Sequence, residues 1–155
     1  MSLLAVDPGL NGCGWALWDD DLICAGFAEI GDSARMPAMW GRLAARVIEA
    51  PPEPPKKVVV ELMRIYTDGK SDPADILLLQ GLAGALLGVA HDRGMETHGL
   101  LASVWKGQVP RGAMGARIER EIEQRGWQDR ITWPTRKTWR NDVCHAIALA
   151  KYAAR

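Results

Sequence analysis

Short apolar runs alternate with longer stretches of helical spacing along the chain. The first three runs are separated by turn residues, which is typical of an antiparallel meander. Two later runs stand between helical patterns, and such strands run parallel to the first strand of a sheet. The predicted strands cover residues 3–6, 13–18, 22–30, 57–62 and 95–100.

Apolar positions three and four residues apart predict the helices. These cover residues 37–49, 73–92, 114–125 and 141–154, with a short helix or turn over 102–107. Ser71 or Asp72 can cap the second helix, and Asn141 can cap the last. The order βββ-α-β-α-β-α-α indicates an α/β fold with a mixed five-stranded sheet flanked by helices. A chain of 155 residues is typical of one domain, over residues 1–155.

The helix predicted over 73–92 is apolar nearly all round. A helix of this kind must be covered on all sides, and the sheet can cover only one of them. The other side needs a second layer or a second subunit. Leu77, Gly81, Gly84 and Gly88 are spaced along this helix and are our candidates for a dimer interface.

Composition places the chain among intracellular globular proteins. It is 48% hydrophobic, and its three cysteines have no CxxC spacing, which disfavours a disulfide framework or a zinc site. We therefore expect reduced thiols, a cytoplasmic location and no membrane span. The formal net charge is zero, yet residues 105–140 hold nine basic and four acidic side chains. That segment is either a nucleic-acid surface or a solvated helix.

Two acids follow predicted strands, and two further polar residues open the last helix. Asp7 and Glu61 stand at the carboxyl ends of their strands, where open α/β sheets place their sites. Asp142 and His145 are three residues apart and share a helix face. Each alone can be structural. If they converge, three carboxylates and one imidazole suit Mg²⁺ or Mn²⁺.

These residues stand in motifs that resemble those of the RuvC family of Holliday-junction resolvases. Asp7-Pro8-Gly9 is similar to the opening strand motif, and Glu61 to the second acid. Residues 72–89 resemble the interface helix, and 141–150 the closing motif. The four motifs occur in order over nearly the whole chain. His145 stands where many members carry an acid, and the family tolerates histidine in this ligand cluster.

The resemblance implies a ribonuclease-H-like fold, a homodimer, and paired symmetric nicking of four-way DNA junctions. It implies two Mg²⁺ or Mn²⁺ ions per site, with catalytic and metal-binding roles for Asp7, Glu61, Asp142 and His145. The stretch 103–106, followed by a charged helix, is similar to phage-type and other divergent members. A bacterial or phage-encoded protein is therefore expected.

Candidate DNA contacts flank these acids. Lys106 is our first candidate to neutralise a phosphate, with Lys70 or Arg111 as alternatives. The stretch 63–72 directly follows Glu61. Its Arg64 and Tyr66 are further candidates, the tyrosine by stacking on an opened base. A surface lysine at 106 and a packed Tyr66 are the plainer interpretations.

Other functions share parts of this pattern. Sugar-kinase and actin-like ATPases also begin with a strand that ends in Asp-x-Gly. They need two such domains, and 155 residues cannot supply both. A related nuclease for flaps, ribosomal RNA precursors or RNA–DNA hybrids would have the same acids. A junction-binding scaffold without cleavage would have no need of four convergent ligands.

Overall fold

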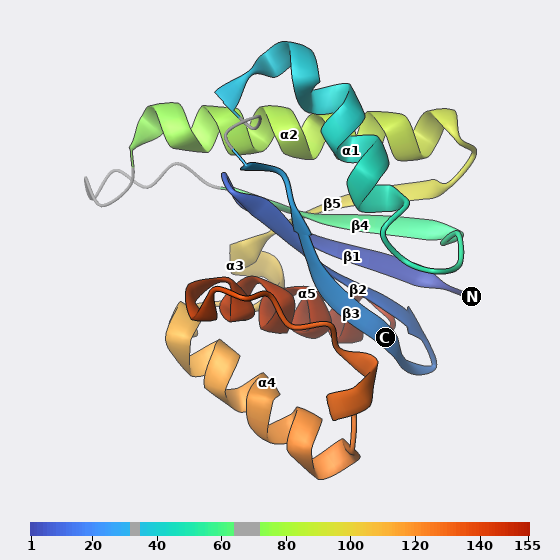
Figure 1. The fold of residues 1–155 in the computed structure, drawn as a ribbon, viewed down its shortest axis with the longest axis vertical. Coiled ribbons are helices and arrows are strands. Elements are labelled where there is room, and N and C mark those ends of the chain that lie inside the picture. The colour runs from blue at the N-terminus through green and yellow to red at the C-terminus, as the bar shows by residue number, and fades with distance from the viewer. Residues whose placement is uncertain (32–34, 64–71) are drawn as a thin grey trace.

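The computed structural model describes residues 1–31, 35–63 and 72–155 of the chain (Figure 1). Three residues expected to contact DNA, Arg64, Tyr66 and Lys70, lie outside the described residues. Within the described part, five strands form one mixed sheet with helices on both faces, as the sequence predicts.

The strand order across the sheet is β3-β2-β1-β4-β5. β1, β2 and β3 form the antiparallel meander, whereas β4 and β5 run parallel to β1. β1 is buried along its whole length because it has a strand on each edge and helices over both faces. The strands are β1 (Leu3–Pro8), β2 (Gly12–Asp19), β3 (Asp21–Glu29), β4 (Lys57–Leu62) and β5 (Glu96–Leu101).

The helices form a layer on each side of the sheet (Figure 1). α1 and α2 cover one face. α5 covers the other, and α4 packs on the outside of α5. Turns of 3-10 helix at Pro37–Met39 and Lys137–Trp139 lead into α1 and α5. The helices are α1 (Trp40–Ile48), α2 (Pro73–Asp92), α3 (Ala102–Trp105), α4 (Arg111–Arg125) and α5 (Arg140–Ala153).

The alternation of side chains along β1 decides which layer each residue meets. Leu4 and Val6 belong to the core under α1 and α2, while Leu3 and Ala5 belong to the core under α5. Successive side chains of a strand point to opposite faces. Asp7 therefore follows Leu3 and Ala5 onto the α5 face.

Helix boundaries differ from the sequence expectation at several places. α1 begins at Trp40 and not at residue 37, and α3 ends at Trp105 and not at residue 107. α4 begins at Arg111, three residues earlier than predicted. α5 begins at Arg140, so Asn141 is not its cap; the cap position is Trp139 and carries no side-chain hydrogen bond. The expectation for α2 is confirmed, because Asp72 Oδ1 accepts a hydrogen bond from the backbone N–H of Ala74 at 2.9 Å.

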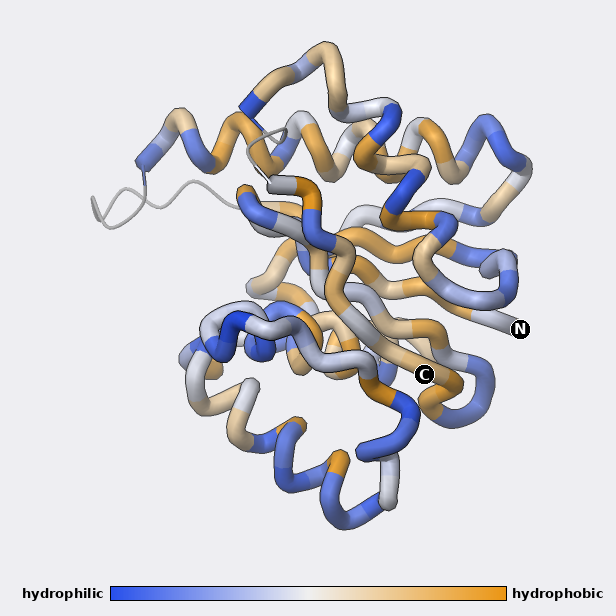
Figure 2. Tube along the Cα trace, viewed as in Figure 1, coloured by the Kyte–Doolittle hydropathy of each residue, from blue (hydrophilic) through white to orange (hydrophobic). Residues whose placement is uncertain are grey.

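α2 is long and apolar (Figure 2), but only some of its residues are buried. Its length and composition alone would let it cross a membrane, which is weak evidence because core helices pass the same test. Leu82 and Leu86 are fully buried, whereas Leu77 is 63% exposed. Gly84 and Gly88 are also exposed on this helix. One side of α2 thus packs on the sheet, and an apolar side is left open.

Candidate active site

β1 and β4 bring two carboxylates to the same edge of the sheet. The last parallel pair in register is Val6 with Val60, and Asp7 and Glu61 each follow this pair by one residue. Val59 shares the core under α5, so Glu61, two residues later, also points toward α5. Both carboxylates are almost completely buried.

α5 supplies the other two side chains from its first turns. Asp142 and His145 lie on one face of the helix, and both are buried. Gly14 of β2 lets the helix approach the sheet, because a Cβ at this position would stand 2.1 Å from the backbone oxygen of Asp142. The His145 ring reaches β1, with Nδ1 3.5 Å from Oδ2 of Asp7.

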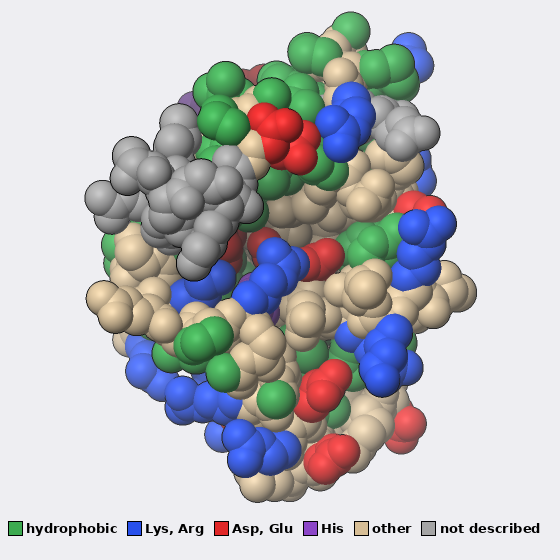
Figure 3. Space-filling model, turned by 90° about the vertical axis from the view of Figure 1, so that its left-hand side faces the viewer, with side chains coloured by type: hydrophobic (Ala, Val, Ile, Leu, Met, Phe, Trp, Pro, Cys, Tyr) green, Lys and Arg blue, Asp and Glu red, His purple; other side chains and the backbone are tan. Residues whose placement is uncertain are grey.

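Two basic side chains lie against these acids. Lys106 Nζ is 3.8 Å from Oε1 of Glu61. Arg111 is ion-paired with Asp142, and its Nη2 is 4.0 Å from Oδ2 of Asp7. Figure 3 shows this end of the molecule, with acidic side chains set back at its centre and basic side chains beside and below them.

A hydrogen bond fixes the orientation of His145. Its Nε2–H donates to the backbone carbonyl oxygen of Arg111 at 3.1 Å. A carbonyl only accepts, so Nε2 carries a proton and the neutral ring keeps its lone pair on Nδ1. Nδ1 of His145, Oδ2 of Asp7 and Oε2 of Glu61 are buried without a hydrogen-bond partner. Buried polar atoms are normally paired, so three such atoms together point to a missing partner.

Burial changes the acidity of this cluster. Burial, and then the charge of Asp7, raise the pKa of Glu61 to about 7, although Lys106 opposes the shift. The same two causes raise the pKa of Asp142 to about 7, against the opposing charge of Arg111. The carboxyls are therefore costly to ionise together, and a cation between them would relieve the cost.

The donor set fits a divalent cation. Carboxylate oxygens with one imidazole nitrogen suit Mg²⁺ or Mn²⁺, and the unpaired atoms of Asp7, Glu61 and His145 offer three donors. In the part of the chain that the structure describes, no group of three or more His, Cys, Asp or Glu side chains is already placed to hold a metal ion. Asp142 is instead occupied by Arg111.

The other predicted residues fall into two groups. Lys106 and Arg111, proposed from sequence as DNA contacts, lie at the acidic cluster. Gly81 faces α1 inside the chain, because its Cβ would stand 2.1 Å from the ring of Trp40. Leu77, Gly84 and Gly88 lie on the open side of α2.

Sequence reasoning overlooked two contributors to the site. Trp105 lies edge-on to His145, with ring centroids 6.1 Å apart, and it also packs beside Lys106. In the sequence, its position directly before Lys106 was the one signal that could have placed Trp105 near the site. Gly14 carried no local signal, because its close approach to α5 depends on tertiary packing.

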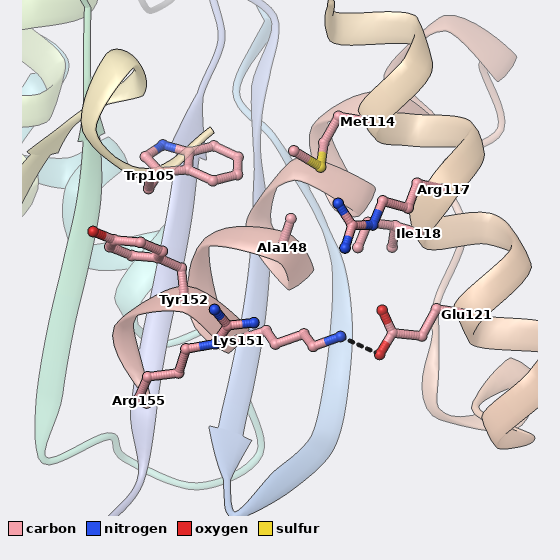
Figure 4. Close-up of a pocket in the computed structure, with 9 residues that line it drawn as sticks. All are labelled: Trp105, Met114, Arg117, Ile118, Glu121, Ala148, Lys151, Tyr152 and Arg155. Carbon is pink, nitrogen blue, oxygen red and sulfur yellow. Dashed lines mark hydrogen bonds and ion pairs between the residues drawn. The ribbon is translucent and has the colours of Figure 1, made fainter. Parts of the chain in front are cut away.

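A hollow of about 160 Å³ lies beyond Trp105, between α4 and α5 (Figure 4). Arg117, Lys151 and Arg155 line it, and Lys151 is ion-paired with Glu121. The four predicted metal ligands are not among its lining residues. This hollow is therefore separate from the acidic cluster, with Trp105 on the side toward His145.

Comparison with known proteins gives matches among solved structures. Thermus thermophilus RuvC in complex with Holliday junction substrate matches with a TM-score of 0.66 and 18% identity, over 97% of this chain and 90% of that chain. Another T. thermophilus RuvC structure gives 0.59 and 18%, over 99% and 95%. The yeast mitochondrial Holliday junction resolvase gives 0.54 and 11%, over 96% and 75%. No protein-family model and no curated protein sequence matches.

At such low identity, the likeness concerns the fold. The strand order, the parallel addition of β4 and β5 and the helices on both faces agree with the ribonuclease-H-like architecture expected from the sequence. The chain therefore has the ribonuclease-H-like fold of these resolvases over almost its full length.

Proposed function

We propose that this chain is a metal-dependent endonuclease that resolves four-way DNA junctions by paired symmetric nicks. The observation that carries the proposal is the set of buried, unpaired atoms on Asp7, Glu61 and His145, at the edge of a fold that T. thermophilus RuvC also has. Asp142 completes the set from the first turn of α5. A structural role would pair these atoms with protein donors instead.

The chain's own residues have distinct tasks in this proposal. Asp7, Glu61, Asp142 and Nδ1 of His145 would hold the cations. Two Mg²⁺ or Mn²⁺ ions would supply a water of lowered pKa and charge stabilisation at the leaving oxygen. The Arg111 carbonyl keeps the lone pair of His145 directed toward Asp7.

Lys106 is placed to meet a phosphate of the bound strand. Its side chain is only 17% exposed, with Nζ 5.5 Å from the centre of the Trp105 ring. The ring restricts the ammonium group to the neighbourhood of Glu61. A cation held in this way stabilises phosphate charge without a large reorganisation.

The open side of α2 is our candidate for the homodimer interface. A two-fold dimer would present two equivalent sites to a junction of approximate two-fold symmetry. Leu77 is largely exposed, and a Cβ at Gly84 or Gly88 would meet no atom within 4 Å. A second α2 could therefore approach closely along this side.

A nicking assay on a synthetic four-way junction tests the proposal. Linear duplex, a flap and an RNA–DNA hybrid run beside it, with Mg²⁺ or Mn²⁺. Paired nicks on the junction are expected, and Asp7→Asn should reduce them at least 1,000-fold, since the group lost is a shared metal ligand. Asp92→Asn is the matched control, because this exposed acid ends α2.

Each other outcome changes the proposal in a defined way. Cleavage of the flap or the hybrid with the junction intact would move the function to another branched or RNA-containing substrate. Junction binding without cleavage by either metal would contradict the catalytic role and leave a scaffold.

A further inference from the structure

The guanidinium of Arg111 lies beside Asp142 and Asp7, where the proposed site would bind a metal ion. Arg111 is the first residue of α4, and its guanidinium contacts carboxylates from two other elements. One contact is the ion pair with Asp142 of α5, and the other is the 4.0 Å approach to Asp7 of β1. The other basic side chain recorded against these acids, Lys106, lies on Glu61.

The guanidinium and a metal ion compete for the same negative charge. Arg111 donates to Oδ1 of Asp142, and its Nη2 also lies 4.0 Å from Oδ2 of Asp7, which accepts no hydrogen bond. A carboxylate oxygen that accepts an ion-paired N–H cannot at the same time give that lone pair to a divalent cation. The donor chemistry suits Mg²⁺ or Mn²⁺, and in the structure Arg111 supplies the positive charge beside Asp142.

We infer that Arg111 is an internal counter-cation that competes with divalent metal for Asp142 and Asp7, and that a DNA phosphate draws it away from them. The second half of this inference rests on the proposed function. Metal loading and DNA binding then strengthen each other, because each favours the state in which Arg111 has left the carboxylates.

The exposure of Arg111 makes the exchange feasible. Its side chain is 53% exposed, while the Asp7 and Asp142 side chains are 2% and 11% exposed. The guanidinium can therefore swing outward with no change in the buried groups. A phosphate offers it the same bidentate geometry as a carboxylate. Release must occur by exchange of partners, since an arginine does not lose its proton in proteins.

The backbone of Arg111 would stay in place during this exchange. Its carbonyl oxygen accepts the hydrogen bond from His145, and its neighbour in α4, Met114, is buried in the core under α5. Only the side chain has to move. Replacing the side chain should therefore leave the orientation of His145 intact.

Calorimetric titration with Ca²⁺ in the absence of DNA tests the competition directly. Arg111→Gln is expected to bind Ca²⁺ about tenfold more tightly than the wild type, within the usual range of coupling between sites. Arg111→Lys keeps a charge but cannot bridge two carboxylates, so an intermediate affinity is expected. Arg117→Gln, on an exposed position of the same helix, should bind as the wild type does.

A thermal melt in EDTA and in Ca²⁺ separates competition from loss of fold. Arg111→Gln should melt earlier than the wild type in EDTA, because the acids lose their counter-cation. Ca²⁺ should raise its melting temperature by more than it raises that of the wild type. Equal or weaker Ca²⁺ binding by a folded Arg111→Gln protein would overturn the inference.

The DNA arm repeats the titrations on a four-way junction, with a denaturing gel to verify that the strands stay intact. The junction should increase the Ca²⁺ affinity of the wild type by more than it increases that of Arg111→Gln. The extra increase should be about tenfold, the same as the difference between the two proteins without DNA. Equal gains would overturn the DNA-driven exchange. Because the first titration contains no DNA, its result stands even if the nicking assay fails on every substrate.

Discussion

α5 and α2 lie on opposite faces of one sheet, and the difference between them explains much of the molecule. Both are long helices with apolar central stretches. α5 is buried without a break from Asp142 to Ala150. α2 buries separate positions such as Leu82 and Leu86 and leaves Leu77 in the open. Apolar sequence therefore shows that a helix needs cover but does not say what covers it.

The elements that pack on α5 and on α2 determine what each helix can do. α4 packs Met114, Ile118 and Ile122 against α5, so the sheet and α4 enclose α5 together. An enclosed helix can carry charged groups into a site of low dielectric. α1 reaches α2 through the contact of Trp40 with Gly81 and leaves Leu77, Gly84 and Gly88 uncovered. The side of α2 that carries these residues can serve an encounter with a second chain.

The largest contrast is expected in core truncations. Leu149→Ala in α5 should lower the free energy of unfolding by about 4 kcal/mol, because the side chain is fully buried and leaves a cavity. Leu77→Ala in α2 should cost less than about 0.5 kcal/mol in the isolated chain, since surface changes are small. Urea denaturation at protein concentrations that keep the chain monomeric measures both. Equal losses would contradict the contrast.

The second contrast uses a glycine on each side of the sheet. Gly14→Ala should cost about 3 kcal/mol and impair nicking, because the new Cβ meets the backbone of Asp142 and neither backbone can turn aside. Gly84→Ala meets no atom within 4 Å and should stabilise the helix by up to about 1 kcal/mol. The comparison uses urea denaturation with far-UV circular dichroism. A fully stable Gly14→Ala protein would show that α5 is not held as closely as described.

A charge on the open side of α2 should weaken the proposed dimer without unfolding the chain. Gly84→Arg is expected to raise the dimer dissociation constant about 100-fold, as a charge buried without a partner costs about 3 kcal/mol. Sedimentation velocity measures the oligomeric state, and circular dichroism shows whether the chain is folded. Asp92→Asn, at the end of the same helix, is the control. A dimer unaffected by Gly84→Arg would place the interface elsewhere.

The smallest effect concerns pH. Because the pKa of Asp142 is raised to about 7 in the folded chain, that state holds the proton more tightly than the unfolded one. The tighter proton binding by Asp142 adds its whole contribution to the free energy of unfolding below about pH 4. That contribution is lost as the pH rises from about 4 to about 7. Glu61 acts in the same direction. In EDTA, Asp142→Asn should reduce the loss between pH 5 and pH 8 by about 2 kcal/mol.

The control for the pH experiment is Asp92→Asn, which should keep the wild-type difference between the two pH values. Urea denaturation at both values gives the free energies. If Asp142→Asn shows the same pH dependence as the wild type, the carboxyl is not as strongly affected by burial as its position indicates.

Periodicity predicted the sheet well because four of the strands had clear apolar patterns, while the pattern over residues 95–100 was weaker. The five strands, the parallel addition of β4 and β5 and the Asp72 cap all agree with the structure. Helix starts were less predictable. α4 begins early at Arg111, because Gly112 weakens a helical signal that Arg111 and Ala113 would otherwise give. α5 continues from a 3-10 turn, and Asn141 is not its cap.

The acidic residues of the candidate site could be predicted from the sequence, but the contact that Arg111 makes with them could not. Asp7 and Glu61 follow buried strands in register, and Asp142 with His145 shares a helix face; local patterns carry both signals. The contact of Arg111 with Asp142 spans 31 residues and exists only because α4 packs on α5. No spacing rule reports such a contact.

The chain order of these elements has a consequence for biosynthesis. Asp7 lies in the first strand, while Asp142 and His145 lie in α5, which follows every strand of the sheet. Translation adds about 5–20 residues per second, and each domain generally folds as a unit. A nascent chain that still lacks α5 has half of the ligands and no helix over that face of the sheet. The proposed site could therefore form only after α5 has been made, so the proposed activity would be absent from the growing chain.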